Sequence, residues 1–232
     1  MEYIHNTEQF QFHNTVVALG KFDGMHKGHQ LIFDELIQYK QLGYQAAVFS
    51  FDRPPLNMLK HKHMRVIYTT NEKIKLLARR GIDIYIEHPF TDEFSHLSPE
   101  DFVIKVLLEK TGMKVLVVGD DCGFGYKRQG NVELLERMSK EYDFKLIVIP
   151  KLELEGEIVS STRIRHLLSE GKVEEANRLM EDPFMICGSV VHGNHMGAEV
   201  LQMPTANQIP LEDKLLPPNG VYVSRIHYKD ET

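Results

Sequence analysis

The segment Gly20–His29, GKFDGMHKGH, joins a short apolar run to an apolar-periodic segment that starts near Gln30. This pattern predicts a strand, a turn and a helix start within about fifteen residues. His26 and His29 would lie at the helix N-terminus, where unpaired backbone N–H groups and the helix dipole favour an anion. Glycine at position 28 would let a phosphate approach the backbone closely. The motif predicts a nucleoside triphosphate site, and the alternative is a turn with solvated histidines.

A second predicted helix start, SSTRIR, combines hydroxyl groups with arginines. Ser160, Ser161 and Thr162 offer capping hydroxyls. Arg163 and Arg165 stand in the first turn, where the dipole normally favours acidic residues. Cations at this position favour a bound polyphosphate. Arg165 is the stronger candidate, and for Arg163 the alternative is a solvated helix face.

Two further turns follow predicted strands, and each has a structural alternative. Asp120 or Asp121, with Gly119, would hold a ribose hydroxyl or orient a base, and Phe124 would pack against a ring. The alternative there is a solvated acidic turn. The sequence FDRPP at 51–55 ends another predicted strand and would point into the same cleft; a rigid turn made by paired prolines is the alternative.

Composition restricts the class of protein. The chain has 232 residues, a net charge of −6 and ordinary apolar and charged fractions, 42% and 26%. The negative charge argues against broad binding to nucleic acid or anionic membranes. Cys122 and Cys187 are far apart, which indicates free thiols rather than a zinc site. With no apolar run of transmembrane length and no signal-peptide pattern, we expect a cytoplasmic protein.

Short apolar runs alternate with helical patterns through most of the chain. Glycines 43, 81 and 112 follow helical patterns, where a left-handed residue is expected. The alternation predicts a doubly wound, mainly parallel α/β sheet with ligands at the carboxyl ends of its strands. The predicted strands are 16–19, 45–51, 82–86, 115–118 and 146–149, and the predicted helices are 30–41, 71–80, 99–110, 132–141, 162–169 and 173–180.

The pattern changes near Pro183, after which glycine-punctuated, β-rich runs at 184–191 and 220–223 predict strands. We therefore expect a first domain over 1–182 and a second, smaller segment over 183–232. The second segment is short for an independent barrel.

Segments 20–29, 51–55, 119–125 and 160–165, in this order and spacing, resemble those of the prokaryotic FAD synthetases, the bifunctional riboflavin kinase/FMN adenylyltransferases. Beyond Pro183, the sequences GSVVHG, MPTAN and LP followed by GVY are similar to the start of that family's riboflavin kinase module. The resemblance covers nearly the whole chain. It implies a doubly wound, Rossmann-like nucleotidyltransferase domain followed by a partial C-terminal β-barrel segment.

The resemblance also implies an activity: the FMN phosphate attacks the α-phosphorus of ATP, giving FAD and pyrophosphate. His26, His29 and Arg165 would be catalytic, and bound polyphosphate would favour protonation of the histidines near their ordinary pKa of about 6.5. Mg²⁺ would bridge the phosphates rather than occupy a protein-only cage. The flavin would contact Phe51, Asp52 and Pro55, and the ATP site would comprise Gly20, Phe22, Asp23, Gly28, Gly119, Asp120, Asp121, Phe124, Ser160, Ser161, Thr162 and Arg163.

In the second segment, Thr205 and Asn207 match positions that hold Mg²⁺ and ATP in the family's kinase. The family's kinase module continues past the position of Thr232, so we expect riboflavin kinase activity to be absent and these two residues to be remnants. Strand edges in a half barrel need covering, which makes a homo-oligomer through this segment a further expectation.

Three alternatives remain open at this point. The chain could be another nucleotidyltransferase, a fragment of a complete bifunctional enzyme, or a non-catalytic flavin or nucleotide sensor. Departures from the family pattern at Lys21, Pro54 and Cys122 favour the sensor.

Overall fold

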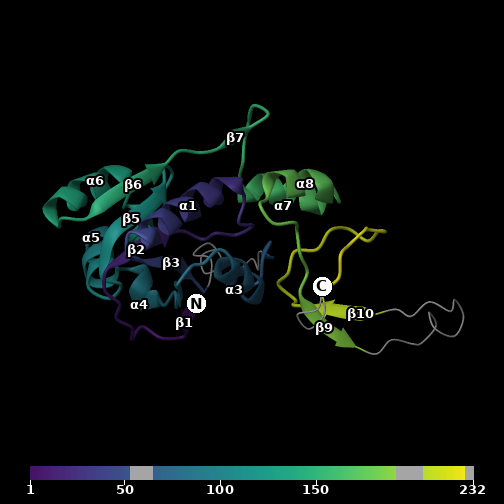
Figure 1. Cartoon of the computed structure of the whole chain (residues 1–232), viewed down its shortest axis with the longest axis horizontal. Helices are drawn as coiled ribbons and strands as arrows, with labels where there is room; N and C mark the ends of the chain where they lie inside the picture. Colours follow the sequence, from purple (N-terminus) through teal and green to yellow (C-terminus); the bar gives the residue numbers. More distant parts are fainter. Residues whose placement is uncertain (53–64, 192–205, 228–232) are drawn as a thin grey trace, which may run out of the picture.

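The computed structural model describes residues 1–52, 65–191 and 206–227 (Figure 1), so that Pro54, Pro55 and Thr205 lie outside the described residues. Its main element is a six-stranded sheet in the order β1-β4-β3-β2-β5-β6, in which every neighbouring pair is parallel. The strands are β1 (Glu2–His5), β2 (Thr15–Leu19), β3 (Gln45–Phe51), β4 (Ile84–His88), β5 (Met113–Gly119) and β6 (Lys145–Ile149).

Alternate side chains of each buried strand point to opposite sides of the sheet, and helices cover both faces. Val16 and Ala18 of β2 pack on one face, and Val17 and Leu19 pack on the other. The first face is covered by α1 (Lys27–Gln41), α3 (Thr70–Arg79), α7 (Ser161–Ser169) and α8 (Val173–Leu179). The second is covered by the π-helix η1 (Phe102–Leu108), which continues α5 (Pro99–Asp101), and by α6 (Val132–Glu141). The predicted doubly wound fold is confirmed.

Local sequence signals explain most helix ends. Thr69 and Glu72 form a reciprocal capping box at the start of α3. The glycines at 43, 81 and 112 have φ values of 95°, 82° and 61°, as predicted for helix C-termini. The predicted helix over 99–110 differs in detail, because its second part winds as a π-helix. Shorter elements are α4 (Asp92–Ser95), the 3-10 turn η2 (Tyr126–Arg128) and the hairpin of β7 (Glu153–Leu154) and β8 (Glu157–Ile158).

The last segment is a small β-rich unit. Strand β9 (Gly188–Val191) pairs antiparallel with β10 (Asn207–Pro210), and this ribbon lies at the opposite end of the molecule from α6 (Figure 1). The expected strand over 184–191 is confirmed only from Gly188 onward. Residues 220–223 are not a strand, so that prediction is wrong.

Within the described ranges, no helix is long and apolar enough to cross a membrane.

Candidate active site

The loop from Gly20 to His26 leaves the carboxyl end of β2 in the middle of the sheet. Strand β2 pairs with β3 on one side and with β5 on the other, and the chain reaches these two neighbours through separate crossovers. The carboxyl ends of β2 and β5 therefore flank the position where the strand order reverses. In open α/β sheets this is where ligands bind.

The loop contains two non-glycine residues with left-handed backbone conformations. Phe22 and Met25 have φ values of 48° and 34°, and both side chains are buried in the core. Left-handed backbone is unfavourable for non-glycine residues, and such positions often occur at functional sites. A Cβ at Gly20 would lie 2.8 Å from the Phe22 ring, so Gly20 makes room for that ring. We therefore find packing roles for Gly20 and Phe22.

His26 is the N-cap of α1, which begins three residues earlier than the pattern predicts. The His29 backbone N–H donates to Nδ1 of His26 at 3.3 Å, so the neutral His26 ring carries its proton on Nε2. The two imidazoles stack with their centroids 3.6 Å apart. A Cβ at Gly28 would lie 3.1 Å from Nδ1 of His26, so the glycine leaves space for this ring.

Burial lowers the pKa of both histidines. The pKa of His26 falls to about 4, although the charges of Asp23 and Asp121 oppose this shift. The pKa of His29 falls well below its usual value because of burial and the neighbouring His26 ring. Without a ligand, both rings are therefore neutral at pH 7, and the expectation that bound polyphosphate favours their protonation stays a prediction. A neutral imidazole still donates one hydrogen bond.

Arg165 joins the N-terminal half of α7 to this loop. Its Nη2 donates to the buried carboxylate of Asp23 and its Nη1 donates to the carbonyl of Arg65. The Ser161 hydroxyl donates to the Asp23 carbonyl. Two helix N-termini, neither with an acidic residue in its first turn, are thus tied together through one aspartate.

Both carboxylate oxygens of Asp23 accept hydrogen bonds. Its Oδ1 accepts the backbone N–H groups of Ile67 at 2.9 Å and Tyr68 at 3.3 Å, and its Oδ2 accepts from Arg165. These contacts let Asp23 support Arg165, and the direct ATP contact that the sequence suggested for Asp23 stays a prediction.

The other polar residues at the start of α7 contact their own helix, solvent or β8. Ser160 is the N-cap, and its side chain accepts the backbone N–H of Arg163 at 3.2 Å. Thr162 is exposed. The Arg163 guanidinium pairs with Glu157 of β8 at 2.7 Å, and its Nη1 is buried without a partner among the described residues. This geometry separates Arg163 from Arg165.

At the carboxyl end of β5, the two aspartates pair with the same residue. Asp120 Oδ2 accepts the Lys151 backbone N–H at 3.1 Å, and the Lys151 ammonium lies 3.1 Å from Asp121 Oδ2. Gly119 leads into this turn. Phe124 is buried in the core of the sheet's second face, where its ring lies 5.9 Å from that of Phe102. The structure thus gives Phe124 a packing position, away from the face that carries α1 and α7.

The expected flavin residues lie at the carboxyl end of β3. Phe51 is half-buried among the rings of Phe90, Phe94 and Phe102. Asp52 Oδ1 accepts the Phe90 backbone N–H at 2.9 Å. Strand β3 is the neighbour of β2, so this end of the sheet adjoins the histidine loop.

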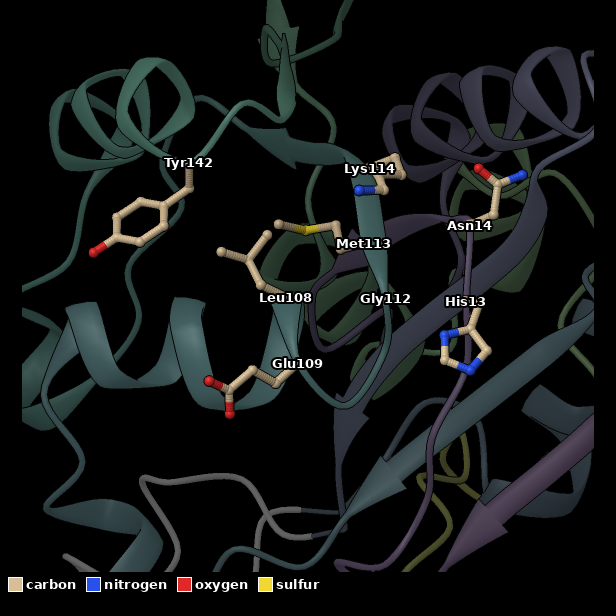
Figure 2. Close-up of a pocket in the computed structure, with 8 residues that line it drawn as sticks. All are labelled: His13, Asn14, Leu108, Glu109, Gly112, Met113, Lys114 and Tyr142. Carbon is tan, nitrogen blue, oxygen red and sulfur yellow. The ribbon is translucent and has the colours of Figure 1, made fainter.

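A pocket of about 400 Å³ opens at the opposite end of the strands from the histidine loop, near the amino ends of β2 and β5 (Figure 2). Its lining includes His13, Glu109, Lys114 and Tyr142, and none of the predicted site residues. No group of three or more His, Cys, Asp or Glu side chains in the described part of the chain could hold a metal ion.

Sequence reasoning missed three contributors to the site. The Arg65 carbonyl accepts a hydrogen bond from Arg165. The backbone N–H of Lys151 donates to Asp120, and its ammonium pairs with Asp121. Met180, at the end of α8, forms a β-bridge with His26. These contacts join residues far apart in the chain. No local pattern signals them.

Comparisons with known proteins identify two family models along this chain. The FAD synthetase family model matches residues 8–163, and the riboflavin kinase family model matches residues 180–232. Because the second match is to a riboflavin kinase model, the expectation that kinase activity is absent is not supported.

Curated relatives and a solved structure extend these matches. The bifunctional riboflavin kinase/FMN adenylyltransferase of Buchnera aphidicola (Schizaphis graminum) is 38% identical, over 96% of this chain and 72% of that protein. Its namesake from Listeria monocytogenes is 35% identical, over 99% and 74%. A crystal structure described as a macrolide-efflux protein from Streptococcus pneumoniae superposes with a TM-score of 0.81 at 32% identity, over 95% of this chain and 72% of that one. The chain therefore belongs to the FAD synthetase family.

Proposed function

We propose that this protein transfers AMP from ATP to FMN and releases FAD and pyrophosphate. The observation that carries the proposal is the Asp23–Arg165 ion pair, which fixes a cation beside the loop of His26 and His29. The backbone N–H groups of Lys27 and Gly28 at the start of α1 have no partner among the described residues. Together these groups suit a polyanion at the carboxyl end of β2.

The chemistry requires positioning more than proton transfer. A phosphate oxygen of FMN attacks the α-phosphorus of ATP. The bond from that phosphorus to the oxygen bridging toward the β-phosphorus breaks, and pyrophosphate leaves with the electron pair. A phosphomonoester has a second pKa of about 6, so the FMN phosphate is largely a dianion at pH 7 and needs no general base. The residues must align the reactants and stabilise the developing charge.

Each group then has a specific task. The Nε2–H of His26, with His29, donates to the α- and β-phosphate oxygens. Arg165 has five N–H groups, of which Asp23 and Arg65 occupy two, so the remaining N–H groups hold the leaving pyrophosphate. Thr162, exposed at the same helix start, adds a hydroxyl.

Phe51 and Asp52 are the described residues proposed to contact the flavin. Mg²⁺ would reach the site on the phosphates of ATP, with Asp120 or Asp121 as candidate carboxylates; it would neutralise phosphate charge during the transfer. We place the boundary between the adenylyltransferase domain and the riboflavin-kinase-like segment at 182/183. There the Asp182 carboxylate pairs with Arg80 at 2.9 Å just before Pro183.

Phosphorylation of riboflavin is a second candidate activity. It is supported by the match of residues 180–232 to the riboflavin kinase family model. Asn207, the described member of the matching pair, lies at the start of β10.

Labelled ATP distinguishes the two activities in one experiment. The protein is incubated with Mg²⁺ and ATP labelled at the α- or γ-phosphate, together with FMN or riboflavin, and the flavins are resolved by chromatography. Adenylyl transfer puts the α label into FAD and the γ label into pyrophosphate. Kinase activity puts the γ label into FMN made from riboflavin. Absence of α label in any flavin would overturn the adenylyltransferase proposal.

A further inference from the structure

A fully buried lysine links the C-terminal segment to the candidate active site. Lys214 is 1% exposed, and its ammonium donates to the Ile67 carbonyl at 2.6 Å and to Glu72 Oε2 at 2.7 Å. The ammonium also lies 4.5 Å from the centre of the Phe184 ring and 5.1 Å from that of Tyr68. Lysine is almost never fully buried unless it is paired, so this arrangement constrains its neighbours closely.

Glu72, the partner of Lys214, is itself fully buried and binds two parts of the molecule at once. Its Oε2 accepts the Thr69 backbone N–H at 2.8 Å, which completes the capping box of α3. Its Oε1 accepts the Cys187 backbone N–H at 2.7 Å. One carboxylate therefore holds the start of α3 and two points of the region that matches the riboflavin kinase model.

Residues 65–69 lie between this cluster and the active-site aspartate. On one side, the Val66 N–H donates to the Asp213 carbonyl at 2.7 Å, and the Leu215 N–H donates to the Val66 carbonyl at 2.8 Å. On the other side, the Ile67 and Tyr68 N–H groups donate to Asp23. Ile67 thus binds Lys214 through its carbonyl and Asp23 through its amide.

The same short segment also holds the arginine directly, because the Arg65 carbonyl accepts from Arg165. A displacement of residues 65–69 would move both groups that hold Arg165, the Asp23 carboxylate and the Arg65 carbonyl. Removing the Lys214 ammonium would leave the Glu72 carboxylate buried without its counter-charge, which a low-dielectric interior penalises heavily. The segment would have to shift to let water reach that carboxylate.

We propose that Lys214 is a positioning residue for adenylyl transfer: the C-terminal segment holds residues 65–69, and these residues hold Asp23 and Arg165 in their working geometry. The inference rests on the proposed adenylyltransferase function. It assigns the segment over 183–232 a task in the reaction of the first domain, beyond any kinase chemistry of its own.

The test compares Lys214→Met with Lys40→Met. Lys40 is a matched control because its ammonium also donates to one carbonyl, of Gly81, and one carboxylate, of Asp83, both at 2.6 Å and away from residues 65–69. Lys214→Met should lower kcat for FAD formation on the order of 10- to 100-fold, the scale of a misplaced reacting group. Lys40→Met should leave kcat within about twofold, as for a partly exposed ion pair. Equal kcat in the two variants would overturn the inference.

A double-mutant cycle with Arg165→Ala tests the route of the effect. If Lys214 acts through Arg165, then Lys214→Met should change kcat by no more than about twofold once Arg165 is absent. Full multiplication of the two effects would show that Lys214 does not act through Arg165, and would overturn the inference.

A third variant covers the case in which Lys214→Met does not fold. Lys214→Met combined with Glu72→Gln removes both buried charges and keeps a side-chain carbonyl that can accept one of the two backbone N–H groups, that of Thr69 or that of Cys187. It should fold and still turn over slowly, and a wild-type kcat would contradict the inference. A wild-type protein that makes no FAD would instead refute the proposed function, so the two failures are distinguishable.

Discussion

The Arg165 guanidinium donates to the buried carboxylate of Asp23, and this ion pair joins the N-terminal half of α7 to the loop between β2 and α1. The two residues are separated by 142 positions in the sequence. Their pairing turns two helix N-termini, each a weak anion site by itself, into one candidate polyphosphate site.

The stacked histidines should contribute to turnover more than to flavin affinity. We expect His29→Ala to lower kcat for FAD formation by about 10²-fold, the effect of losing one preorganised donor, while the KM for FMN changes little. His166→Ala is the control, because His166 is exposed on α7 and contacts Glu170. Steady-state kinetics of both variants provide the check. Near-normal turnover of the His29 variant would refute its role.

Asp23→Asn should weaken both folding and catalysis. The amide keeps the shape of the side chain but loses the charge that holds Arg165. We expect the free energy of unfolding to fall by about 1–3 kcal/mol, the usual effect on a buried hydrogen-bonded group. Urea unfolding measures this loss, and FAD formation should fall in the same variant. Unchanged stability together with unchanged kcat would contradict the supporting role of Asp23.

Acid should destabilise the protein through the buried histidines. The pKa of His26 is about 4 in the folded state and about 6.5 in the unfolded chain, so the unfolded chain binds the proton first. This contribution to stability is complete above about pH 6.5 and is lost toward pH 4, by up to about 1.4 kcal/mol per pH unit. The lowered pKa of His29 acts in the same direction.

His26→Asn isolates the contribution of His26 to this pH dependence, because asparagine also serves as an N-cap. The free energy of unfolding of the variant should fall less steeply between pH 6.5 and 4 than that of the wild type. Equal slopes would show that His26 does not titrate as described.

Gly28→Ala should impair the site with little effect on folding. The new Cβ would lie 3.1 Å and 3.2 Å from two atoms of the His26 ring, which must move. Alanine also favours the helix by up to about 1 kcal/mol, which offsets the strain. Calorimetric titration with a non-hydrolysable ATP analogue should show weaker binding at nearly unchanged stability. Wild-type affinity and kcat would contradict the close approach proposed at this glycine.

Much of the fold could be predicted from local patterns. The buried runs at β2, β3 and β5 are apolar on both faces, and the glycines after the helices mark their ends. Strand β1 was missed because its four residues are only partly buried and it is defined by pairing with β4, some eighty residues later. Residues 220–223 have strand-like composition, but Val221 and Val223 are fully exposed and pair with no strand among the described residues.

The ligand contacts of the site residues stay predictions, whereas the pairing between these residues is seen only in the structure. Motif spacing and the helix starts indicated His26, His29 and Arg165 as neighbours of one ligand. The sequence could not show that Asp23 serves Arg165, or that Phe124 packs in the opposite core. Glu72 illustrates the reason: its spacing from Thr69 signals a capping box, whereas its contacts with Lys214 and Cys187 depend on the tertiary fold.

The most direct test of the account is the rate of FAD formation from FMN and Mg²⁺-ATP by the wild type, Arg165→Ala and Arg137→Ala. Arg137 is the control because its ion pair with Glu100 is exposed and lies on the helices of the other face. The account predicts that the wild type forms FAD, that Arg165→Ala lowers kcat by about 10²- to 10³-fold, and that Arg137→Ala has little effect. An Arg165→Ala variant that keeps the wild-type kcat would contradict it.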